Sequence, residues 1–437
     1  MRVYYKLDYS SIERIPFGKP VVLAPNHVNA FIDPIIIAML PSYKVRFFAR
    51  GDVFKGKFVK FLLNSINISP IYRIQEGYSE VKKNDKTFQE CKKLLSEDKT
   101  IMLFPEGICI QEKRLHPLKK GMARIVFQTA QSMNYSKDIF IVPIGLNYED
   151  AKRFRSKLYI DFGEPVSLAE YIERFKTDPV RTINEFTKIV EGKMKQQLLI
   201  INNPENDAFA DQLMELFVKD WTVTKGKDIT KLINEYESSK EIVELINYFD
   251  VENKTALEEL KKYIADYFIL LKKDNLRAHL LHPAAISTSN FVTFLIEFIK
   301  LYIGFPFYLL GLLTNYPPYY LAKEISNKKV KEVEFYASFY SNVAMILWLL
   351  FYPTQLLIIA LLFKNWLFFG IYAIAVPLLG IYVLEFYPFM KKTLGRWRLL
   401  RMVRKNKHAI QQLIELRGEI NHRFEKMKEF YFSVYTK

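Results

Sequence analysis

The sequence predicts an α/β domain that is followed by helices, and three observations support this fold class. Short β-rich runs alternate with helical stretches over about the first 165 residues, as in a central sheet covered by flanking helices. Between 170 and 285, apolar residues recur at three- and four-residue spacing among many charges, which indicates amphipathic helices. Two charge-free apolar segments then follow. We expect a central sheet with flanking helices, a helical region and a carboxyl-terminal transmembrane hairpin.

The expected strands and helices alternate in order along the first part of the chain. Helices are expected near 52–65, 87–97 and 119–132, between and around the β-rich runs. The β-rich runs are PVVLAP (20–25), KVRFFAR (44–50), ISPIYR (68–73), TIMLFPE (100–106), IFIVPIG (139–145) and KLYIDFG (157–163).

The two charge-free segments, 340–363 and 365–384, are separated by Lys364. Each is long enough to cross a bilayer, which takes about 20 apolar residues. Pro353 and Pro377 lie inside them, and membrane helices tolerate proline better than soluble helices do. Two buried helices in a large soluble core are the alternative. Two adjacent segments of this length favour a membrane hairpin over 340–384.

A third apolar stretch, 291–320, contains Glu297, Lys300 and several prolines. If it crossed the membrane as well, the chain before it and the chain after the hairpin would lie on opposite sides. We therefore expect an interfacial or re-entrant segment. The complete division is 1–169 for the α/β domain, 170–290 for a charged helical region, 291–320 for this segment, 340–384 for the hairpin and 385–437 for a basic tail.

The chain is basic, with 63 Lys and Arg against 47 Asp and Glu and a net charge of +16. Such a charge favours an anionic partner. The densest basic cluster, 391–407, directly follows the hairpin, where it would contact anionic headgroups and lie in the cytoplasm. No nucleic-acid-binding motif accompanies the charge, so membrane lipids are the expected partner. The two cysteines, Cys91 and Cys109, are too few for a disulfide framework.

Candidate catalytic residues follow the expected strands, where ligands of open α/β sheets bind. His27 and Asp33 come after the first run. Six residues along a helix rotate by about 240°, so the two side chains meet only if the chain turns between them. A carboxylate beside an imidazole fixes its tautomer, as a general base requires. A histidine in an ordinary turn, with Asp33 capping the next helix, is the alternative.

Three further runs place Arg73, Glu106 with Gly107, and Pro143 just after the expected strands, at the same edge of the sheet. Arg73 offers a fork of donors suited to phosphate or carboxylate, or to a surface ion pair. Glu106 lies between a proline and Gly107, in a turn that can point a carboxylate inward or towards water. Lys119 opens the next helical stretch and is expected to attract an anion.

These blocks resemble the glycerol-phosphate and lysophosphatidate acyltransferase superfamily. NHVNAFIDP is similar to the family's His–Asp motif, SPIYR to its arginine block, FPEG to its third block and IVPIG to its fourth, in the family's order over about residues 17–165. Five residues separate His27 from Asp33 here, where most members have four. This spacing, and the hairpin after the domain, resemble the fungal-type glycerol-3-phosphate and dihydroxyacetone-phosphate acyltransferases.

The resemblance implies that His27 takes a proton from the acceptor hydroxyl as this attacks an acyl thioester, while Asp33 orients His27. It implies acyl-CoA or acyl-carrier protein as co-substrate, with neither a cofactor nor a metal. Pro143 would belong to the acyl-donor side. The residues expected around the acceptor phosphate and glycerol are Asn29, Arg73, Glu106, Gly107 and Lys119.

The acceptor itself is left open by the sequence. FPEG is followed by Ile108 and Cys109, whereas the family often has Thr-Arg at this point. Glycerol 3-phosphate is the expected acceptor, dihydroxyacetone phosphate is also compatible, and lysophosphatidate is the main alternative. A non-catalytic, lipid-binding membrane protein would need neither His27 nor Asp33. Cys109 as a nucleophile is a further alternative, although a lone cysteine is more often a packing residue.

Overall fold

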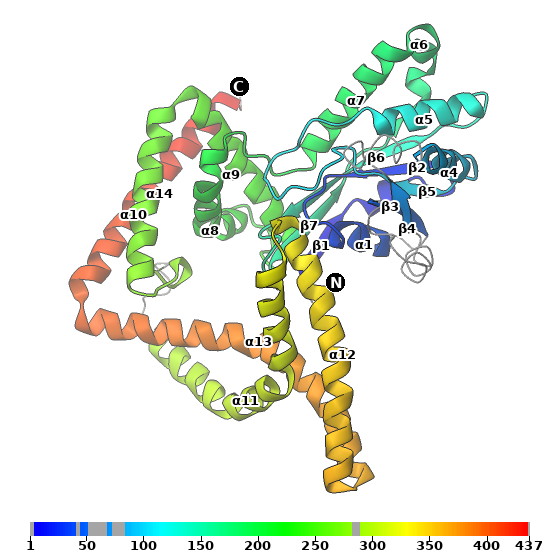
Figure 1. Cartoon of the computed structure of the whole chain (residues 1–437). Helices are drawn as coiled ribbons and strands as arrows, with labels where there is room; N and C mark the ends of the chain where they lie inside the picture. Colours follow the sequence, from blue (N-terminus) through cyan, green and yellow to red (C-terminus); the bar gives the residue numbers. More distant parts are fainter. Residues whose placement is uncertain (1–3, 41–43, 51–67, 72–83, 282–288, 436–437) are drawn as a thin grey trace. The chain divides into compact units, whose positions relative to one another are not determined.

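The computed structural model describes residues 4–40, 44–50, 68–71, 84–281 and 289–435 (Figure 1). Within these ranges each expected β-rich run contains a strand. Two further strands, β1 (Lys6–Ser10) and β8 (Val166–Ser167), were not expected, because one is partly exposed and the other has only two residues. The predicted strands are β2 (Val21–Pro25), β3 (Val45–Arg50), β4 (Ile68–Ile71), β5 (Thr100–Met102), β6 (Phe140–Tyr148) and β7 (Lys157–Phe162).

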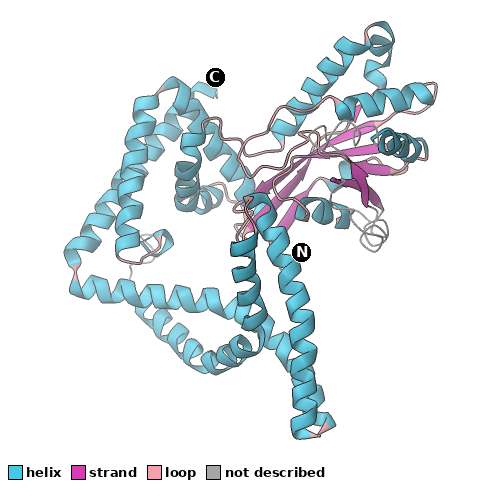
Figure 2. Ribbon diagram, in the orientation of Figure 1, coloured by secondary structure: helices cyan, strands magenta, loops and turns pink. Residues whose placement is uncertain are grey.

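The described strands form one eight-stranded sheet in the order β1-β7-β6-β2-β5-β3-β4, with β8 on β6 (Figure 2). Strand β2 pairs in parallel with both β5 and β6. The antiparallel pairs join β6 to β7 and β6 to β8. Because β2 and β5 are parallel neighbours, the segments that follow Pro25 and Met102 leave the sheet at the same edge. The sheet thereby brings the predicted His–Asp and FPEG blocks together.

Helices cover the sheet because alternate strand residues point to one face. Val22 and Ala24 of β2 share a buried core with residues of α4 (Asn84–Ser96), α5 (Gly121–Ser132) and α7 (Pro179–Gln196). The short helices α1 (Ile32–Met39) and α6 (Ile172–Thr177) complete this part. Helices expected near 87–97 and 119–132 are thus present, and the one expected near 52–65 lies outside the described residues.

The chain divides into two compact units, which we call the α/β unit and the helical unit. The α/β unit comprises Met1–Ile200, Thr230–Tyr236 and Glu332–Ser338. Residues 170–200, which the sequence grouped with the helical region, belong here because α7 buries Phe186 and Val190 in the core of the sheet. The helical unit comprises Ile201–Ile229, Glu237–Lys331 and Phe339–Lys437.

The helical unit has a core made by α8 (Asp207–Thr224), α9 (Leu232–Glu252), α10 (Lys254–Lys273) and α14 (Lys407–Tyr435). Helix α14 falls in the expected basic tail, yet it contributes buried apolar residues such as Leu413, Ile420 and Phe424 to this core. The Phe424 ring stacks on Phe217 of α8, with centroids 4.0 Å apart. Arg423 Nη1 lies 2.6 Å from Glu259 Oε2 of α10. The end of the chain is therefore a structural helix of this unit.

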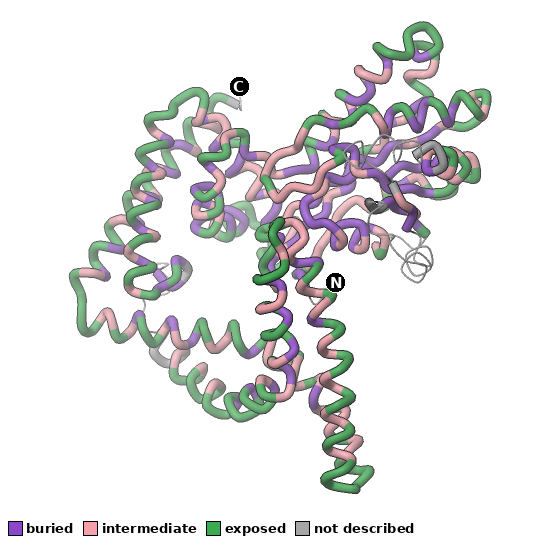
Figure 3. The backbone as a smooth tube through the Cα atoms, viewed as in Figure 1, coloured by how far each residue is buried: buried purple, intermediate pink, exposed green. Residues whose placement is uncertain are grey.

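Among the described residues, three helices are long and apolar enough to cross a membrane: α11 (Ser289–Lys329), α12 (Tyr336–Phe363) and α13 (Trp366–Lys405). Helices α12 and α13 are largely exposed along their length (Figure 3). Lys364 joins them in the left-handed conformation, with φ of 48°. The Tyr352 hydroxyl donates to the Ala373 carbonyl at 2.5 Å, and Tyr372 donates to Gln355 Oε1 at 2.7 Å. The two helices thus form the antiparallel hairpin expected at 340–384.

Helix α11 contains the whole 291–320 stretch and continues through Pro306, Pro317 and Pro318 as one curved helix (Figure 1). Such bends are typical of proline inside a helix. It packs along α13, where Asn315 Nδ2 donates to the Val376 carbonyl at 3.0 Å. The helix is continuous across 291–320. The interfacial or re-entrant location of this segment stays a prediction.

Candidate active site

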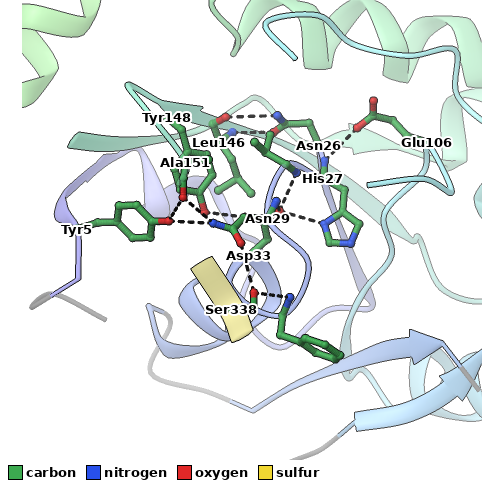
Figure 4. Close-up of polar contacts among 12 residues, drawn as sticks. Tyr5, Asn26, His27, Asn29, Asp33, Glu106, Leu146, Tyr148, Ala151 and Ser338 are labelled. Atoms are coloured by element: carbon green, nitrogen blue, oxygen red, sulfur yellow. Dashed lines mark hydrogen bonds and ion pairs between the residues drawn. The ribbon is translucent and has the colours of Figure 1, made fainter. Parts of the chain in front are cut away.

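His27 and Asp33 lie side by side just beyond the carboxyl end of β2 (Figure 4). His27 Nδ1 is 3.0 Å from Asp33 Oδ2. The turn that the sequence required between them is present, because the Asn29 carbonyl accepts the amides of Ile32 and Asp33, both at 3.0 Å. This turn starts α1 and returns the carboxylate to the imidazole. The predicted pair is therefore assembled.

The Asp33 carboxylate is fully buried and accepts hydrogen bonds on both oxygens. Oδ2 accepts the amides of Val28 at 2.8 Å and Asn29 at 2.7 Å, besides its contact with His27. Oδ1 accepts the Tyr148 hydroxyl at 2.6 Å. Burial and the nearby Asp33 charge raise the pKa of Tyr148 well above its usual value, so this hydroxyl keeps its proton and donates. The carboxylate is held in one orientation.

Two other segments hold His27 from the opposite side. Its amide donates to Glu106 Oε1 at 3.0 Å, and its carbonyl accepts the Ile110 amide at 3.0 Å. The imidazole stacks on Phe104, with centroids 3.9 Å apart. The FPEG block therefore fixes the position of His27. Its Nδ1 faces Asp33, so Nε2 is the nitrogen that can exchange a proton with a substrate.

Glu106 is buried and uses both carboxylate oxygens within the protein. Oε1 accepts the His27 amide, and Oε2 accepts the His116 amide at 2.9 Å. Burial raises the pKa of Glu106, partly offset by these two amides. The side chain thereby ties the start of the FPEG loop to its end. The predicted contact of Glu106 with a substrate stays a prediction.

Gly107 and Lys119 are brought together by the same loop. Gly107 has φ of +69°, a conformation that favours glycine. A Cβ placed there would lie 3.3 Å from Lys119 Cγ, and the Lys119 amide donates to the Pro105 carbonyl at 2.7 Å. Lys119 is exposed just before α5. Its ammonium can therefore reach an anion near the loop.

Asn29 is completely buried, although the sequence placed it among the substrate-binding residues. Its Nδ2 donates to the Tyr5 hydroxyl at 2.8 Å and to the Ala151 carbonyl at 3.1 Å. The side chain is thus bonded to the protein interior and supports the turn after His27. Tyr5 and Tyr148 could not be recognised from the sequence as part of the site, since neither belongs to a motif. The only signal was the place of Tyr148 at the end of β6.

The remaining predicted residues have different outcomes. Arg73 lies outside the described residues. Pro143 was expected after a strand end, but it is buried within β6, opposite Ala24 of β2. The run continues as a strand through Tyr148 because β7 pairs with its second half. The Pro143 carbonyl accepts the Gly163 amide at 2.8 Å. The assignment of Pro143 to the acyl-donor side stays a prediction.

This chain is similar to a known protein family and to several known proteins. The family model described as Acyltransferase matches residues 6–147. The chain is 26% identical to glycerol-3-phosphate O-acyltransferase 2 of Saccharomyces cerevisiae over 64% of its own length and 36% of that protein. It is 24% identical to glycerol-3-phosphate O-acyltransferase 1 of the same yeast, over 54% and 31%. The chain thus spans about a third of the length of these two relatives.

Two bacterial proteins are also similar. The 1-acyl-sn-glycerol-3-phosphate acyltransferase of Bacillus subtilis is 25% identical over 42% of this chain and 87% of that protein. The crystal structure of the 1-acyl-sn-glycerophosphate acyltransferase from Thermotoga maritima aligns with a TM-score of 0.33 and 16% identity, over 45% of this chain and 72% of that one. The family match contains both the His27–Asp33 pair and the FPEG block. Residues 6–147 therefore match the acyltransferase family model as one domain.

Proposed function

We propose that this protein is a membrane-bound acyltransferase that moves a fatty acyl group from a thioester to a hydroxyl of glycerol 3-phosphate. The observation that carries the proposal is the buried Asp33 carboxylate, bonded to His27 Nδ1 at the carboxyl edge of the sheet. The likeness to two yeast glycerol-3-phosphate acyltransferases supports this acceptor. The function would place the protein in phospholipid biosynthesis.

The proposed reaction uses His27 as a general base. Asp33 accepts a hydrogen bond from Nδ1–H, which keeps this proton on Nδ1 and leaves the lone pair on Nε2. Nε2 takes the proton of the acceptor hydroxyl as its oxygen attacks the thioester carbonyl. The carbon–sulfur bond then breaks, and the thiol leaves with the proton returned from His27. The products are an ester and a free thiol, and no acyl group is attached to the enzyme.

The acceptor phosphate requires cations near the FPEG loop. We assign Lys119 to this role because its exposed side chain lies against Gly107, and we retain Arg73 for its fork of donors. Dihydroxyacetone phosphate carries the same phosphate. Lysophosphatidate is the second candidate, favoured by the likeness to the Bacillus subtilis enzyme. The donor is acyl-CoA or acyl-carrier protein.

Two packing observations support a location of the active site relative to the membrane. Glu332–Ser338, after α11, belongs to the α/β unit, so the chain is on the side of that unit when α11 ends. Helix α14, after α13, shares a core with α8 and α10, which precede α11. Since a packed core lies on one side of a membrane, the number of crossings between α10 and α14 is even. We propose that α12 and α13 cross and that α11 does not.

This topology places the α/β unit and α14 on the same side, which we take to be the cytoplasm because acyl thioesters are supplied there. It can be tested with single cysteines in a Cys91→Ser, Cys109→Ser background and an impermeant maleimide on sealed vesicles. Lys273→Cys, Lys331→Cys and Lys407→Cys should label from one side, and Lys364→Cys only from the other. Labelling of Lys331→Cys from the side opposite to Lys273→Cys would show that α11 crosses.

The acyl transfer itself can be tested with the purified full chain in lipid nanodiscs. Labelled acyl-CoA is offered with glycerol 3-phosphate, dihydroxyacetone phosphate or lysophosphatidate in parallel reactions. We expect the largest kcat/KM with glycerol 3-phosphate. Preference for lysophosphatidate would favour the second candidate. Absence of transfer to all three acceptors, from both acyl-CoA and acyl-carrier protein, would contradict the proposal.

A further inference from the structure

A short segment that precedes the apolar part of α12 contacts the α/β unit at three separate places. This segment, Glu332–Ser338, lies about 300 residues after the His–Asp turn in the chain, yet it clusters with the α/β unit. Gln111 Nε2, in the loop after FPEG, donates to the Val333 carbonyl at 3.2 Å. Lys152 Nζ, beyond β6, lies 4.4 Å from the centre of the Tyr336 ring. The segment thus joins the loops that follow β5 and β6.

The third contact reaches the turn that carries His27 and Asp33. Ser338 is 2% exposed, and its hydroxyl donates to Asn29 Oδ1 at 3.3 Å and accepts the Phe31 amide at 3.2 Å (Figure 4). The Phe31 and Phe335 rings meet edge to face, with centroids 6.3 Å apart. Ser338 therefore binds the middle of the five-residue connection between the two catalytic side chains.

This contact has a physical consequence for the turn. The Phe31 amide lies at the start of α1, where the first amides of a helix have no partner within the helix. Phe31 is half-buried and its amide donates to Ser338 Oγ, so removal of the hydroxyl takes away this acceptor, which is unfavourable. The Asn29 amide donates to Asp33 Oδ2, so movement of Asn29 also moves the donors that hold the carboxylate.

We propose that Ser338 is a positioning residue for the active site: through Asn29 and Phe31 it holds the turn in which Asp33 orients His27. The inference rests on the proposed acyl transfer, which it deepens. Ser338 lies in the first turn of α12, a helix apolar enough to cross a membrane. The order of the catalytic turn is thus linked to the first turn of this helix, which belongs to the α/β unit.

The test compares Ser338→Thr with Ser338→Val in the full-length protein. Threonine and valine have nearly the same shape, so any crowding affects both variants, and only threonine keeps the hydroxyl. We expect kcat of Ser338→Val to fall about tenfold below that of Ser338→Thr, the size of effect given by one buried hydrogen bond. The KM for the acyl donor should change less than about twofold, because a positioning residue does not touch the donor. Equal kcat for both variants would overturn the proposal.

A second measurement does not depend on activity. Hydrogen exchange of a peptide covering 28–34 should be faster in Ser338→Val than in Ser338→Thr, while a peptide from α5 (Gly121–Ser132) exchanges equally in both. This difference in exchange is expected even if the wild-type chain transfers no acyl group. Failure of the proposed acyl transfer can therefore be distinguished from failure of the proposed role of Ser338. Equal exchange at 28–34 would show that Ser338 does not hold the turn.

A matched control and a fallback variant complete the test. Ser326 is fully buried, and its hydroxyl donates to the Ala322 carbonyl within α11 at 2.7 Å. Ser326→Ala removes the same group from a similar environment and should leave exchange at 28–34 unchanged. If both β-branched variants fail to fold, Ser338→Ala is compared with Ser326→Ala instead. Equal hydrogen exchange at 28–34 and equal kcat in these two variants would overturn the proposal.

Discussion

The α/β unit and the helical unit use polar groups in opposite ways. In the α/β unit, the buried carboxylates of Asp33 and Glu106 gather beyond two neighbouring strands, and both bond His27. In the helical unit the core is apolar, and rings such as Phe217 and Phe424 join helices that lie far apart in the chain. Buried polar groups fix one geometry, whereas apolar rings mainly supply stability.

This difference predicts that substitution of one side chain should have different consequences in the two units. A polar substitution at the site should reduce the rate with little loss of folding stability, provided that the buried partners remain bonded. An apolar truncation in the helical core should instead reduce stability through lost burial and a cavity. The following variants test this contrast.

Asp33→Asn should have the largest effect on activity. The amide removes the charge that faces His27 and turns an NH2 group towards donors that now bond a carboxylate. We expect kcat to fall about 10²–10⁴-fold, the usual contribution of general-base catalysis. Asp161→Asn, on β7 of the same sheet, is the control. A variant with more than half of the wild-type rate would show that Asp33 does not support the base.

Phe424→Ala should destabilise the helical unit by about 3–5 kcal/mol, the cost of truncating a buried aromatic residue. Thermal unfolding in detergent, together with hydrogen exchange in α8 and α10, measures the effect. Phe430, which is 52% exposed on the same helix, provides the control Phe430→Ala. If both variants unfold at the same temperature, α14 is not part of the core.

Glu106→Gln tests whether Glu106 holds the FPEG loop in place or contacts a substrate. An amide has one acceptor oxygen, so the His27 or the His116 amide would lose its partner, at a cost of about 1–3 kcal/mol. We expect a lower unfolding temperature together with a lower kcat. Glu112→Gln, on the exposed part of the loop, is the control. An unchanged unfolding temperature with a raised acceptor KM would instead place Glu106 on the substrate.

Cys109→Ser should have the smallest effect, with a change in kcat below about twofold, as for most substitutions outside the essential contacts. Direct attack by the acceptor needs no thiol nucleophile. Intact-mass measurement after incubation with the acyl donor alone should show no acyl adduct. A thioester mapped to Cys109 would contradict the direct mechanism.

Much of the α/β unit could be predicted from the sequence because its signals are local. A β-rich run ending in Pro25 and followed by His27 places the imidazole at a sheet edge, and FPEG marks the neighbouring strand. Other features depend on long-range contacts. Tyr5 reaches Asn29 from just before β1, a strand at the edge of the sheet. Ser338 reaches the same residue from more than 300 positions away. No local pattern encodes such contacts.

The helical unit was less predictable for the same reason. Periodicity indicates that α14 is amphipathic, but an apolar face gives no information about its partner. Its basic surroundings and its place after the hairpin favoured a tail, whereas Phe424 and Met427 are buried with α8 and α10. Similarly, the sequence of 291–320 favoured an interfacial or re-entrant segment. In the structure this stretch is part of one curved helix that packs along α13.

The most direct test of the central claim is single-turnover acyl transfer to glycerol 3-phosphate by His27→Ala in lipid nanodiscs. His422→Ala, at an exposed position on α14, is the control. If His27 is the general base, the rate falls about 10²–10⁴-fold, while the unfolding temperature and membrane association stay those of the wild type. A His27→Ala rate within about twofold of the control would contradict the account.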